Sequence, residues 1–244
     1  MTTSLTLSSP FQFSTAEAAK SGFSISGTTG CGKTVTAFRC VRQLQEAGAT
    51  IFIFDPSQAW VEDYPINYIV RFGQNLTDGA LSAGINAVQV KDCILDVSSL
   101  TTLQFQEVAD KFCWLLFNLQ TRIPKEERRQ MYVIFEEAHI VLPEGSMKAK
   151  RLQNIVRLAT VGRNFKIRVG VITQFASMID KNILRFAGQR YFGWTDEYND
   201  VLRVSTMIGK EAAESLKYFK TGEFWYYCPS LGIEEKIKVE PFRK

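Results

Sequence analysis

The stretch from Phe23 to Val35, F-S-I-S-G-T-T-G-C-G-K-T-V, decides what fold to expect. A short apolar strand runs here into a glycine-rich turn, and the turn opens a helix. The glycines at 27, 30 and 32 lack the Cβ atoms that would block a tight bend, so the backbone N–H groups from Thr28 onward can turn toward an anion at the helix N-terminus. The pattern G-x-x-x-x-G-K-[ST] therefore predicts a phosphate-binding loop rather than an ordinary glycine-rich turn.

Each part of this loop has an expected task. Lys33 would reach the β- and γ-phosphates of ATP and contribute to catalysis, and the hydroxyl of Thr34 would bind magnesium. The expected nucleotide-binding residues are Gly27, Thr28, Thr29, Gly30, Cys31, Gly32, Lys33 and Thr34. ATP and Mg²⁺ are thus the expected ligands.

Length and composition favour one α/β domain. The chain has 244 residues, 45% of them apolar, and this is enough for a full core. A net charge of +4 permits a nucleic-acid partner without arguing for one. Five widely spaced cysteines without a C-x-x-C pair, and a single histidine, make a disulfide framework or a zinc site unexpected. The sequence has neither a signal-like N-terminus nor an apolar run of membrane-spanning length, so we expect a soluble cytoplasmic protein that is not transmembrane.

A second chemical centre follows the apolar strand expected over Met131–Phe135, which ends in Glu136 and Glu137. In phosphoryl-transfer ATPases a carboxylate at the tip of such a strand holds the magnesium shell, and the next orients or deprotonates the attacking water. Two adjacent acids can instead begin a helix by pairing with its dipole, and that alternative would be favoured without the phosphate-binding loop. With the loop present, we expect Glu136 to hold magnesium through water and Glu137 to be catalytic.

Two other expected strands also end in polar side chains. Thr50–Asp55 ends in an acid, and Arg168–Thr173 is followed by Gln174. The carboxyl ends of parallel strands gather at the ligand edge of an α/β sheet, so we expect Asp55 to point toward that edge. A lone glutamine after a strand is more often structural, but its place in this pattern favours a catalytic role in sensing the γ-phosphate or the water.

The spacing of apolar residues predicts the remaining elements. Helices are expected over Lys33–Ala47, Thr101–Arg122, Ser146–Val161, Met178–Phe186, Glu197–Ile208 and Lys210–Tyr218. Further strands are expected over Ile69–Phe72, Cys93–Val97, Gln189–Trp194, Glu223–Tyr227 and Glu234–Val239. Residues 1–21 are expected to form an N-terminal arm, extended or with a short edge element, before an ATPase domain over residues 22–244. The polar stretch 73–90 is expected to be a loop or small insertion.

These motifs together resemble the superfamily of HerA and FtsK DNA translocases. The resemblance rests on G-T-T-G-C-G-K-T, on the D-P that ends the second strand, on V-I-F-E-E-A-H, and on the run V-G-R-N-F-K-I-R-V-G-V-I-T-Q-F-A-S-M-I-D. It covers residues 22–239, and its most specific part runs from Arg163 through Gln174.

The resemblance implies a RecA-like P-loop NTPase of the α/β class, with a mainly parallel sheet flanked by helices. It also implies a homo-oligomer, a hexameric ring, in which ATP hydrolysis drives double-stranded DNA through the central pore. Arg163 matches the arginine that acts in trans on the neighbour's ATP, with Arg157 as the next candidate and a surface arginine paired with an acid as the alternative. The chain departs from the family pattern at Glu136, where Asp is usual, and in having no second arginine close before Arg163.

The chain shows no counterpart of the N-terminal barrel of HerA proteins or of the membrane and DNA-reading segments of FtsK. It therefore looks most like the genome-packaging ATPases of icosahedral viruses with an internal membrane. That interpretation adds a capsid vertex or viral membrane protein as a partner, and places the protein in the host cytoplasm or on the virion. A plasmid or conjugative DNA pump, a HerA-type helicase motor and a nucleotide-dependent assembly module are the alternatives. Lys148, Lys150 and Arg151 are candidates to contact DNA in the pore.

Overall fold

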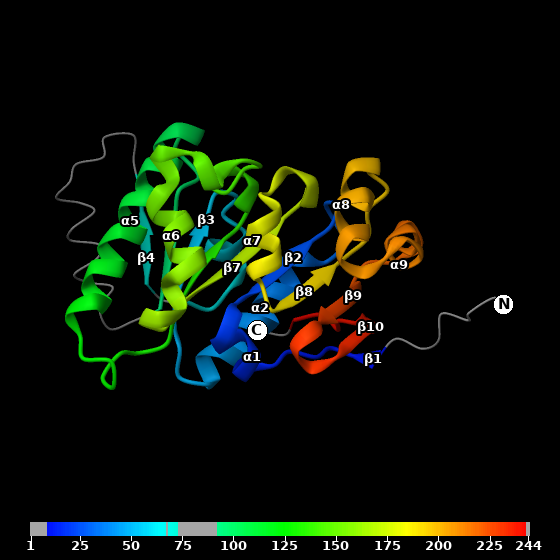
Figure 1. Ribbon diagram of the computed structural model, residues 1–244, viewed down its shortest axis with the longest axis horizontal. Coiled ribbons are helices and arrows are strands. Elements are labelled where there is room, and N and C mark those ends of the chain that lie inside the picture. Colours follow the sequence, from blue (N-terminus) through cyan, green and yellow to red (C-terminus); the bar gives the residue numbers. More distant parts are fainter. Residues whose placement is uncertain (1–8, 67, 73–91, 243–244) are drawn as a thin grey trace.

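The computed structural model describes residues 9–66, 68–72 and 92–242, and Figure 1 shows the arrangement of their helices and strands. The strands are short, and each predicted one is present within two residues of its expected bounds. They are β1 Ser9–Pro10, β2 Phe23–Ser26, β3 Thr50–Asp55, β4 Ile69–Arg71, β5 Cys93–Asp96, β6 Met131–Phe135, β7 Ile167–Thr173, β8 Gln189–Phe192, β9 Glu223–Cys228 and β10 Ile233–Lys238.

These strands form one sheet, in the order β1-β10-β9-β8-β2-β7-β6-β3-β5-β4. Neighbouring strands are parallel except at β9, which runs antiparallel to β8 and to β10. The strand that leads into the glycine-rich loop, β2, lies between β8 and β7 and thus in the middle of the sheet. The predicted α/β architecture with a mainly parallel sheet is confirmed.

Helices cover both faces of the sheet (Figure 1). They are α1 Thr15–Ser21, α2 Lys33–Glu46, α3 Ala59–Asp63, α5 Thr102–Arg122, α6 Gln153–Val161, α7 Lys181–Phe186, α8 Tyr198–Ile208 and α9 Lys210–Ser215. The long helix α5 begins with a capping box, because the Thr101 and Gln104 side chains each accept the other's backbone N–H. Within the described ranges, none of the helices combines the length and the apolar character needed to cross a membrane.

Two apolar layers, one on each face of the sheet, result from the alternation of side chains along the strands. On β3, Phe52 and Phe54 join the layer that also contains residues of α5 and α6, whereas Ile51 and Ile53 join the layer that contains residues of α2 and α3. Both faces are therefore buried. This explains why the central strands are continuous apolar runs in the sequence rather than alternating ones.

The N-terminal segment differs in part from the expectation. Ser9–Pro10 forms the expected edge element by pairing with β10, but residues 15–21 form a helix instead of an extended chain. Ser14 caps this helix by accepting the N–H of Glu17 at 3.2 Å, and Ala18 is fully buried against the sheet. A capping serine before T-A-E-A-A-K is a local helix signal. The helix was not predicted because the segment as a whole is rich in serine and threonine and has no clear apolar period.

The predicted helix Ser146–Val161 begins only at Gln153, after two short 3₁₀ turns. Asp110, on α5, accepts the N–H groups of Asn154 at 2.8 Å and of Ile155 at 3.1 Å. A carboxylate on a neighbouring helix thus caps the N-terminus of α6. The spacing of apolar residues within the segment does not reveal this contact, so the predicted start was wrong.

Smaller differences occur elsewhere. The helix predicted from Met178 begins at Lys181, where the Asp180 side chain accepts the N–H of Asn182 at 3.0 Å. The five-residue α3 was not predicted at all. The loop expected over residues 73–90 lies outside the described residues.

Two leucines on α5 provide a matched test of the layer beneath it. Leu116 is 2% exposed and Leu103 is 53% exposed. We expect Leu116→Ala to lower the free energy of unfolding by about 2–5 kcal/mol, because it removes buried surface and leaves a cavity. Leu103→Ala should change it by less than about 0.5 kcal/mol. Urea unfolding followed by circular dichroism measures both values, and equal losses would contradict this packing of α5.

Candidate active site

The loop between β2 and α2 has the backbone conformation that its glycines permit. Gly27, Gly30 and Gly32 have φ angles of 145°, 82° and 103°, in the region that side chains disfavour. A Cβ on Gly27 would also lie 2.9 Å from the Sγ of Cys31 and 3.1 Å from the backbone of Gly193. The bend at Gly27 therefore needs glycine both for its dihedral angle and for its close packing.

Two segments that sequence reasoning did not assign to the site hold this loop from outside. The N–H of Thr28 donates to the carbonyl of Trp194 at 2.8 Å, and the N–H of Gly222 donates to the carbonyl of Cys31 at 2.8 Å. The Thr28 N–H is thus engaged within the protein, so the N–H groups that face a phosphate begin after it rather than at it. The glycine at 193 was visible in the sequence, but only the pairing of β8 with β2 brings it to the loop.

Lys33, the first residue of α2, lies over the loop. It is 9% exposed, and its Nζ donates to the carbonyl of Thr28 at 3.1 Å. Among the described residues it pairs with no carboxylate. A buried ammonium with only a carbonyl partner is stabilised by an anion, and a nucleotide phosphate supplies one.

The order β2-β7-β6 brings three predicted groups to one edge of the sheet. Ser26 lies opposite Thr173 in the register of β2 and β7, so Gln174 emerges beside the start of the loop. Glu136 and Glu137 follow β6, on the other side of β7. The predicted γ-phosphate sensor therefore lies between the phosphate-binding loop and the acids.

Hydrogen bonds of the Gln174 side chain connect the loop to the acids. Its Oε1 accepts the hydroxyl of Thr29 at 2.8 Å, and its Nε2 donates to Oε1 of Glu137. The other oxygen of Glu137 lies 3.4 Å from Nδ1 of His139, and burial lowers the pKa of this histidine. No role was predicted for His139 from the sequence, although it stands in the same E-E-A-H run.

Glu137 has an unusual backbone conformation. Its φ of 48° and ψ of 47° lie in the left-handed region, which residues other than glycine rarely occupy. A three-residue 3₁₀ turn follows it, so the acids do not begin an α-helix as the alternative interpretation would require. Strained residues of this kind are concentrated at functional sites. Here the conformation accompanies the contacts of Glu137 with Gln174 and His139.

Glu136 is a buried acid with unsatisfied hydrogen-bonding capacity. Burial, together with the charges of Asp55 and Glu137, raises its pKa to about 7. Its Oε1 accepts the hydroxyl of Thr34 at 3.4 Å, whereas Oε2 has no hydrogen-bond partner in the described part of the chain. A buried carboxylate in this state favours either a proton or a cation.

These two oxygen-bearing side chains fit magnesium. Mg²⁺ prefers oxygen ligands, keeps several waters, and is commonly held by one or two protein groups together with substrate phosphates. Thr34 and Glu136 supply a hydroxyl and a carboxylate that already touch, at the end of the loop expected to hold the phosphates. The glutamate that stands in place of the usual aspartate therefore reaches the threonine.

Asp55 lies at this edge, but backbone groups engage its carboxylate. Oδ1 accepts the N–H of Ser57 at 3.1 Å, and Oδ2 accepts those of Trp60 at 2.8 Å and Val61 at 3.1 Å. Asp55 thus holds α3 against the sheet. Its position agrees with the expectation of a polar group at the ligand edge, but its influence on the site comes from its charge, which acts on Glu136.

Arg163 lies just before the amino end of β7, whereas Gln174 follows its carboxyl end. The seven residues of this strand span roughly 20 Å, so the arginine cannot reach the loop of its own chain. It is exposed and forms no ion pair among the described residues, so the alternative of an arginine paired with an acid finds no support there. The guanidinium of Arg157 instead stacks on Phe117, 4.0 Å from the ring centre.

Three features of this site indicate the P-loop NTPase class. They are the glycine-rich loop between a central strand and a helix, the acids at the end of a second strand, and the glutamine that follows the strand between them. Residues 8–164 match the family described as "Type III restriction enzyme, res subunit". This match covers more than half of the chain, so the protein belongs to that family. No curated protein matches the sequence.

Solved structures support the same class of fold. The genome packaging NTPase B204 from Sulfolobus turreted icosahedral virus 2, in complex with ATP-gammaS, matches with a TM-score of 0.66 and 15% identity over 89% of this chain and 96% of that one. VirB4 of Thermoanaerobacter pseudethanolicus gives 0.62 and 14% over 90% and 89%, and the bacterial conjugative coupling protein TrwBdeltaN70 gives 0.66 and 9% over 93% and 86%. The fold is that of a RecA-like P-loop NTPase, as the sequence resemblance implies.

The contacts of Asp55 predict a structural rather than a ligand-binding effect. We expect Asp55→Ala to lower the free energy of unfolding by at least about 1.5 kcal/mol, because the backbone N–H groups at the start of α3 lose a charged acceptor. Asp55→Asn keeps one acceptor oxygen and should lose less. Urea unfolding gives the stability, and titration with a fluorescent ATP analogue gives the affinity of the folded protein, which we expect to stay near the wild-type value. A fully stable Asp55→Ala protein that no longer binds nucleotide would contradict this assignment.

Proposed function

We propose that this protein is an ATP-driven translocase of double-stranded DNA that packages a viral genome. The observation that carries the proposal is the hydrogen-bonded connection from Thr29 in the loop, through Gln174, to Glu137. Gln174 would meet the γ-phosphate and Glu137 would act on water, and this connection joins the two. The likeness to B204, a genome packaging NTPase that the chain covers almost completely, supports the choice of packaging.

The first step is the binding of ATP. The loop from Gly27 to Thr34 receives the phosphates, and Lys33 exchanges the carbonyl of Thr28 for the β- and γ-phosphate oxygens. Thr34 and Glu136 would hold magnesium, Glu136 through water, and the ion would supply positive charge against the charge that develops on the phosphates. The likeness to B204, whose structure is a complex with ATP-gammaS, supports the binding of a nucleotide.

Hydrolysis then depends on Glu137 and Gln174. Glu137 orients a water molecule or takes its proton, and its bond to Gln174 fixes the direction of the carboxylate. Nδ1 of His139 lies 3.4 Å from the other oxygen of this carboxylate, and that buried oxygen has no hydrogen-bond partner among the described residues, so it is open to a water molecule. Gln174 also accepts a hydrogen bond from Thr29. A γ-phosphate that attracts Thr29 or Gln174 would therefore change the hydrogen bond between Gln174 and Glu137. Cleavage is thereby linked to occupation of the loop.

Translocation requires several copies of the chain. In a hexameric ring, Arg163 acts in trans and stabilises the charge that develops on the neighbour's γ-phosphate. The position of Arg163 beyond the far end of β7, exposed and without an ion pair among the described residues, supports this role. Lys148, Lys150 and Arg151 are exposed between the acids and α6, and they contact DNA phosphates in the pore.

A conjugative DNA pump is the second candidate. The likeness to the bacterial conjugative coupling protein TrwBdeltaN70 favours it, since the same contacts would serve either process. The packaging role adds a capsid vertex or viral membrane protein as a partner and a location in the host cytoplasm or on the virion. A major capsid gene beside this gene would distinguish packaging from conjugation.

The role of the acid predicts a separation of binding from turnover. We expect Glu137→Gln to bind ATP normally and to lose at least about a hundredfold in turnover, the low end for a general base. Lys33→Ala serves as the contrast, since losing the loop's cation should weaken binding and abolish hydrolysis. Phosphate release and titration with a fluorescent ATP analogue measure the two quantities. Near-normal turnover in either variant would exclude an ATP-driven motor that uses these residues.

Stimulation of the ATPase by duplex DNA tests the motor against a nucleotide-dependent assembly module. We expect a purified ring to hydrolyse ATP faster with duplex DNA present. Replacing the exposed cations that follow the acids should also reduce the salt dependence of DNA binding by up to about three phosphate contacts. The test variant replaces Lys148, Lys150 and Arg151 with Ala, and the control of equal charge replaces Lys210, Lys217 and Lys220. An unstimulated ring would favour the assembly module, and an unchanged salt slope would place the first cluster outside the DNA path.

A further inference from the structure

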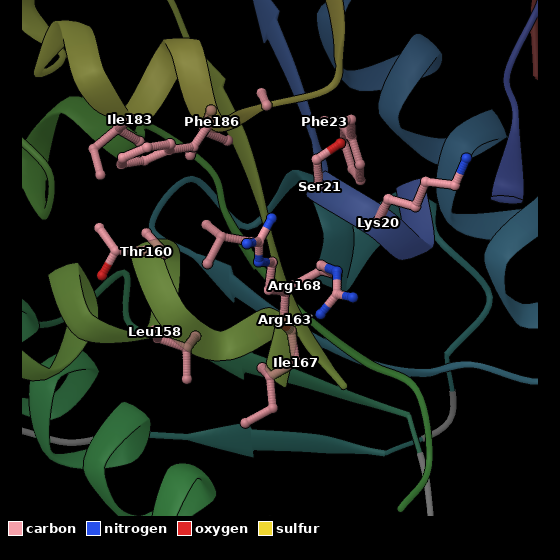
Figure 2. Close-up of a pocket in the computed structure, with 14 residues that line it drawn as sticks. Lys20, Ser21, Phe23, Leu158, Thr160, Arg163, Ile167, Arg168, Ile183 and Phe186 are labelled. Carbon is pink, nitrogen blue, oxygen red and sulfur yellow. Dashed lines mark hydrogen bonds between the residues drawn. The ribbon is translucent and has the colours of Figure 1, made fainter. Parts of the chain in front are cut away.

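A cavity of about 220 Å³ opens at the amino ends of β2 and β7, at the edge of the sheet opposite the phosphate-binding loop (Figure 2). Apolar side chains form much of its wall, among them Leu158 on α6 and Ile183 and Phe186 on α7. Arg163 and Arg168 also line it, and their labelled side chains lie near each other in Figure 2. Nothing in the ATP-binding mechanism explains this cavity.

The cavity holds an excess of positive charge. Its titratable lining residues are Lys20, Arg163 and Arg168, and among the described residues no carboxylate lines it. Lys20 forms an ion pair with Glu17, and its amine points away from the arginines in Figure 2. The two arginines therefore share the space without a counter-charge from the described part of the chain.

Arg168 in particular lacks partners. Its Nη1 donates to the carbonyl of Ile167 at 2.9 Å, but its buried Nε has no hydrogen-bond partner in the described residues. Burial lowers the pKa of this guanidinium, the Tyr132 hydroxyl counters this effect, and the charge of Arg163 lowers it again. Arg168 is half-buried, has an unused buried donor and lies beside the like charge of the exposed Arg163, so an anion between the two would stabilise them.

The chemistry of the pair selects the anion. Guanidinium groups offer several N–H donors in a planar fork that matches the oxygens of a phosphate, and two of them can bind one phosphate from different sides. The volume of about 220 Å³ is several times that of a water molecule, so a phosphate fits together with some of its hydration. The apolar wall lowers the local dielectric and strengthens such contacts.

We propose that Arg163 and Arg168 together form a second phosphate-binding site in this cavity. In an assembled ring its ligand is the terminal phosphate of the nucleotide held by a second copy of this chain, and this part of the inference rests on the proposed function. In isolated protein the same donors bind free inorganic phosphate. Arg168 thus supplies the second arginine that is absent from the sequence just before Arg163.

The first experiment tests the site without requiring hydrolysis. In the Lys33→Ala background, which weakens the loop site, we expect inorganic phosphate to raise the thermal unfolding temperature saturably, in titrations against chloride at constant ionic strength. Adding Arg168→Gln should abolish this rise, and Arg168→Lys should keep part of it, because the charge remains while the fork is lost. The matched control is Arg185→Gln, which removes an exposed charge of α7 that does not line the cavity.

Two outcomes would overturn the site itself. An equal phosphate effect with and without Arg168→Gln would show that the cavity binds no phosphate. An equal loss with Arg185→Gln would show a general effect of charge. A reduced folding yield of Arg168→Gln would not decide the matter alone, since Arg168→Lys still has to show the intermediate affinity.

The second experiment identifies the source of the phosphate. If it is the neighbour's nucleotide, rings of Arg168→Gln should bind ATP normally but turn over about a hundredfold more slowly, as when one transition-state donor is lost. Mixing them with Glu137→Gln subunits should restore part of the activity, because an intact arginine pair then faces an intact acid. Arg163→Ala should behave in the same way, with a loss of about a thousandfold or more.

The remaining outcomes separate the two sources. Wild-type turnover in Arg168→Gln, together with loss of the phosphate effect, would assign the cavity to free phosphate. Confirmed mixed rings without recovery would overturn the role of the neighbour's nucleotide. If the wild-type protein did not hydrolyse ATP, the proposed function would fail, while the phosphate titration would still decide whether the site exists.

Discussion

The rest of the site depends on the position of β7 between β2 and β6. Because parallel strands end at one edge of the sheet, this order places Gln174 between the phosphate-binding loop and the two acids, and its amide bonds both sides at once. A side chain with one donor group and one acceptor oxygen suits this position, since Thr29 donates to it and Glu137 accepts from it. With any other neighbour for β7, the loop and the acids would be separate features.

Much of the fold and of the site followed from local patterns in the sequence. An apolar strand precedes each of the three features of the site, which are the glycine-rich loop, the acids after β6 and the glutamine after β7. The ends of these strands can be predicted from the sequence because both faces of the sheet are buried. Contacts between segments that are distant in the sequence could not be predicted in this way. Asp110 caps a helix that begins 43 positions later in the chain, and Trp194 reaches the loop only because β8 pairs with β2. Local periodicity contains no information about such pairings.

Buried acids at the ligand edge are stabilised in different ways. Backbone N–H groups donate to both carboxylate oxygens of Asp55. Glu136 has only a long contact with a threonine, and its neighbour's charge makes its own ionisation more costly. The sheet edge thus concentrates negative potential at one carboxylate, where a cation is most favoured.

β7 also joins the two chemical edges of the molecule. Gln174 follows its carboxyl end, Arg168 lies near its amino end, and hydrogen-bonded strands flank it on both sides. Such a strand cannot stretch, and a slip by one residue would turn its whole buried face over. A displacement of Gln174 would therefore move Arg168 only if the whole of β7 moved together with the strands on either side of it. The sheet would thereby keep a fixed distance between the phosphate-binding loop and the proposed second phosphate site.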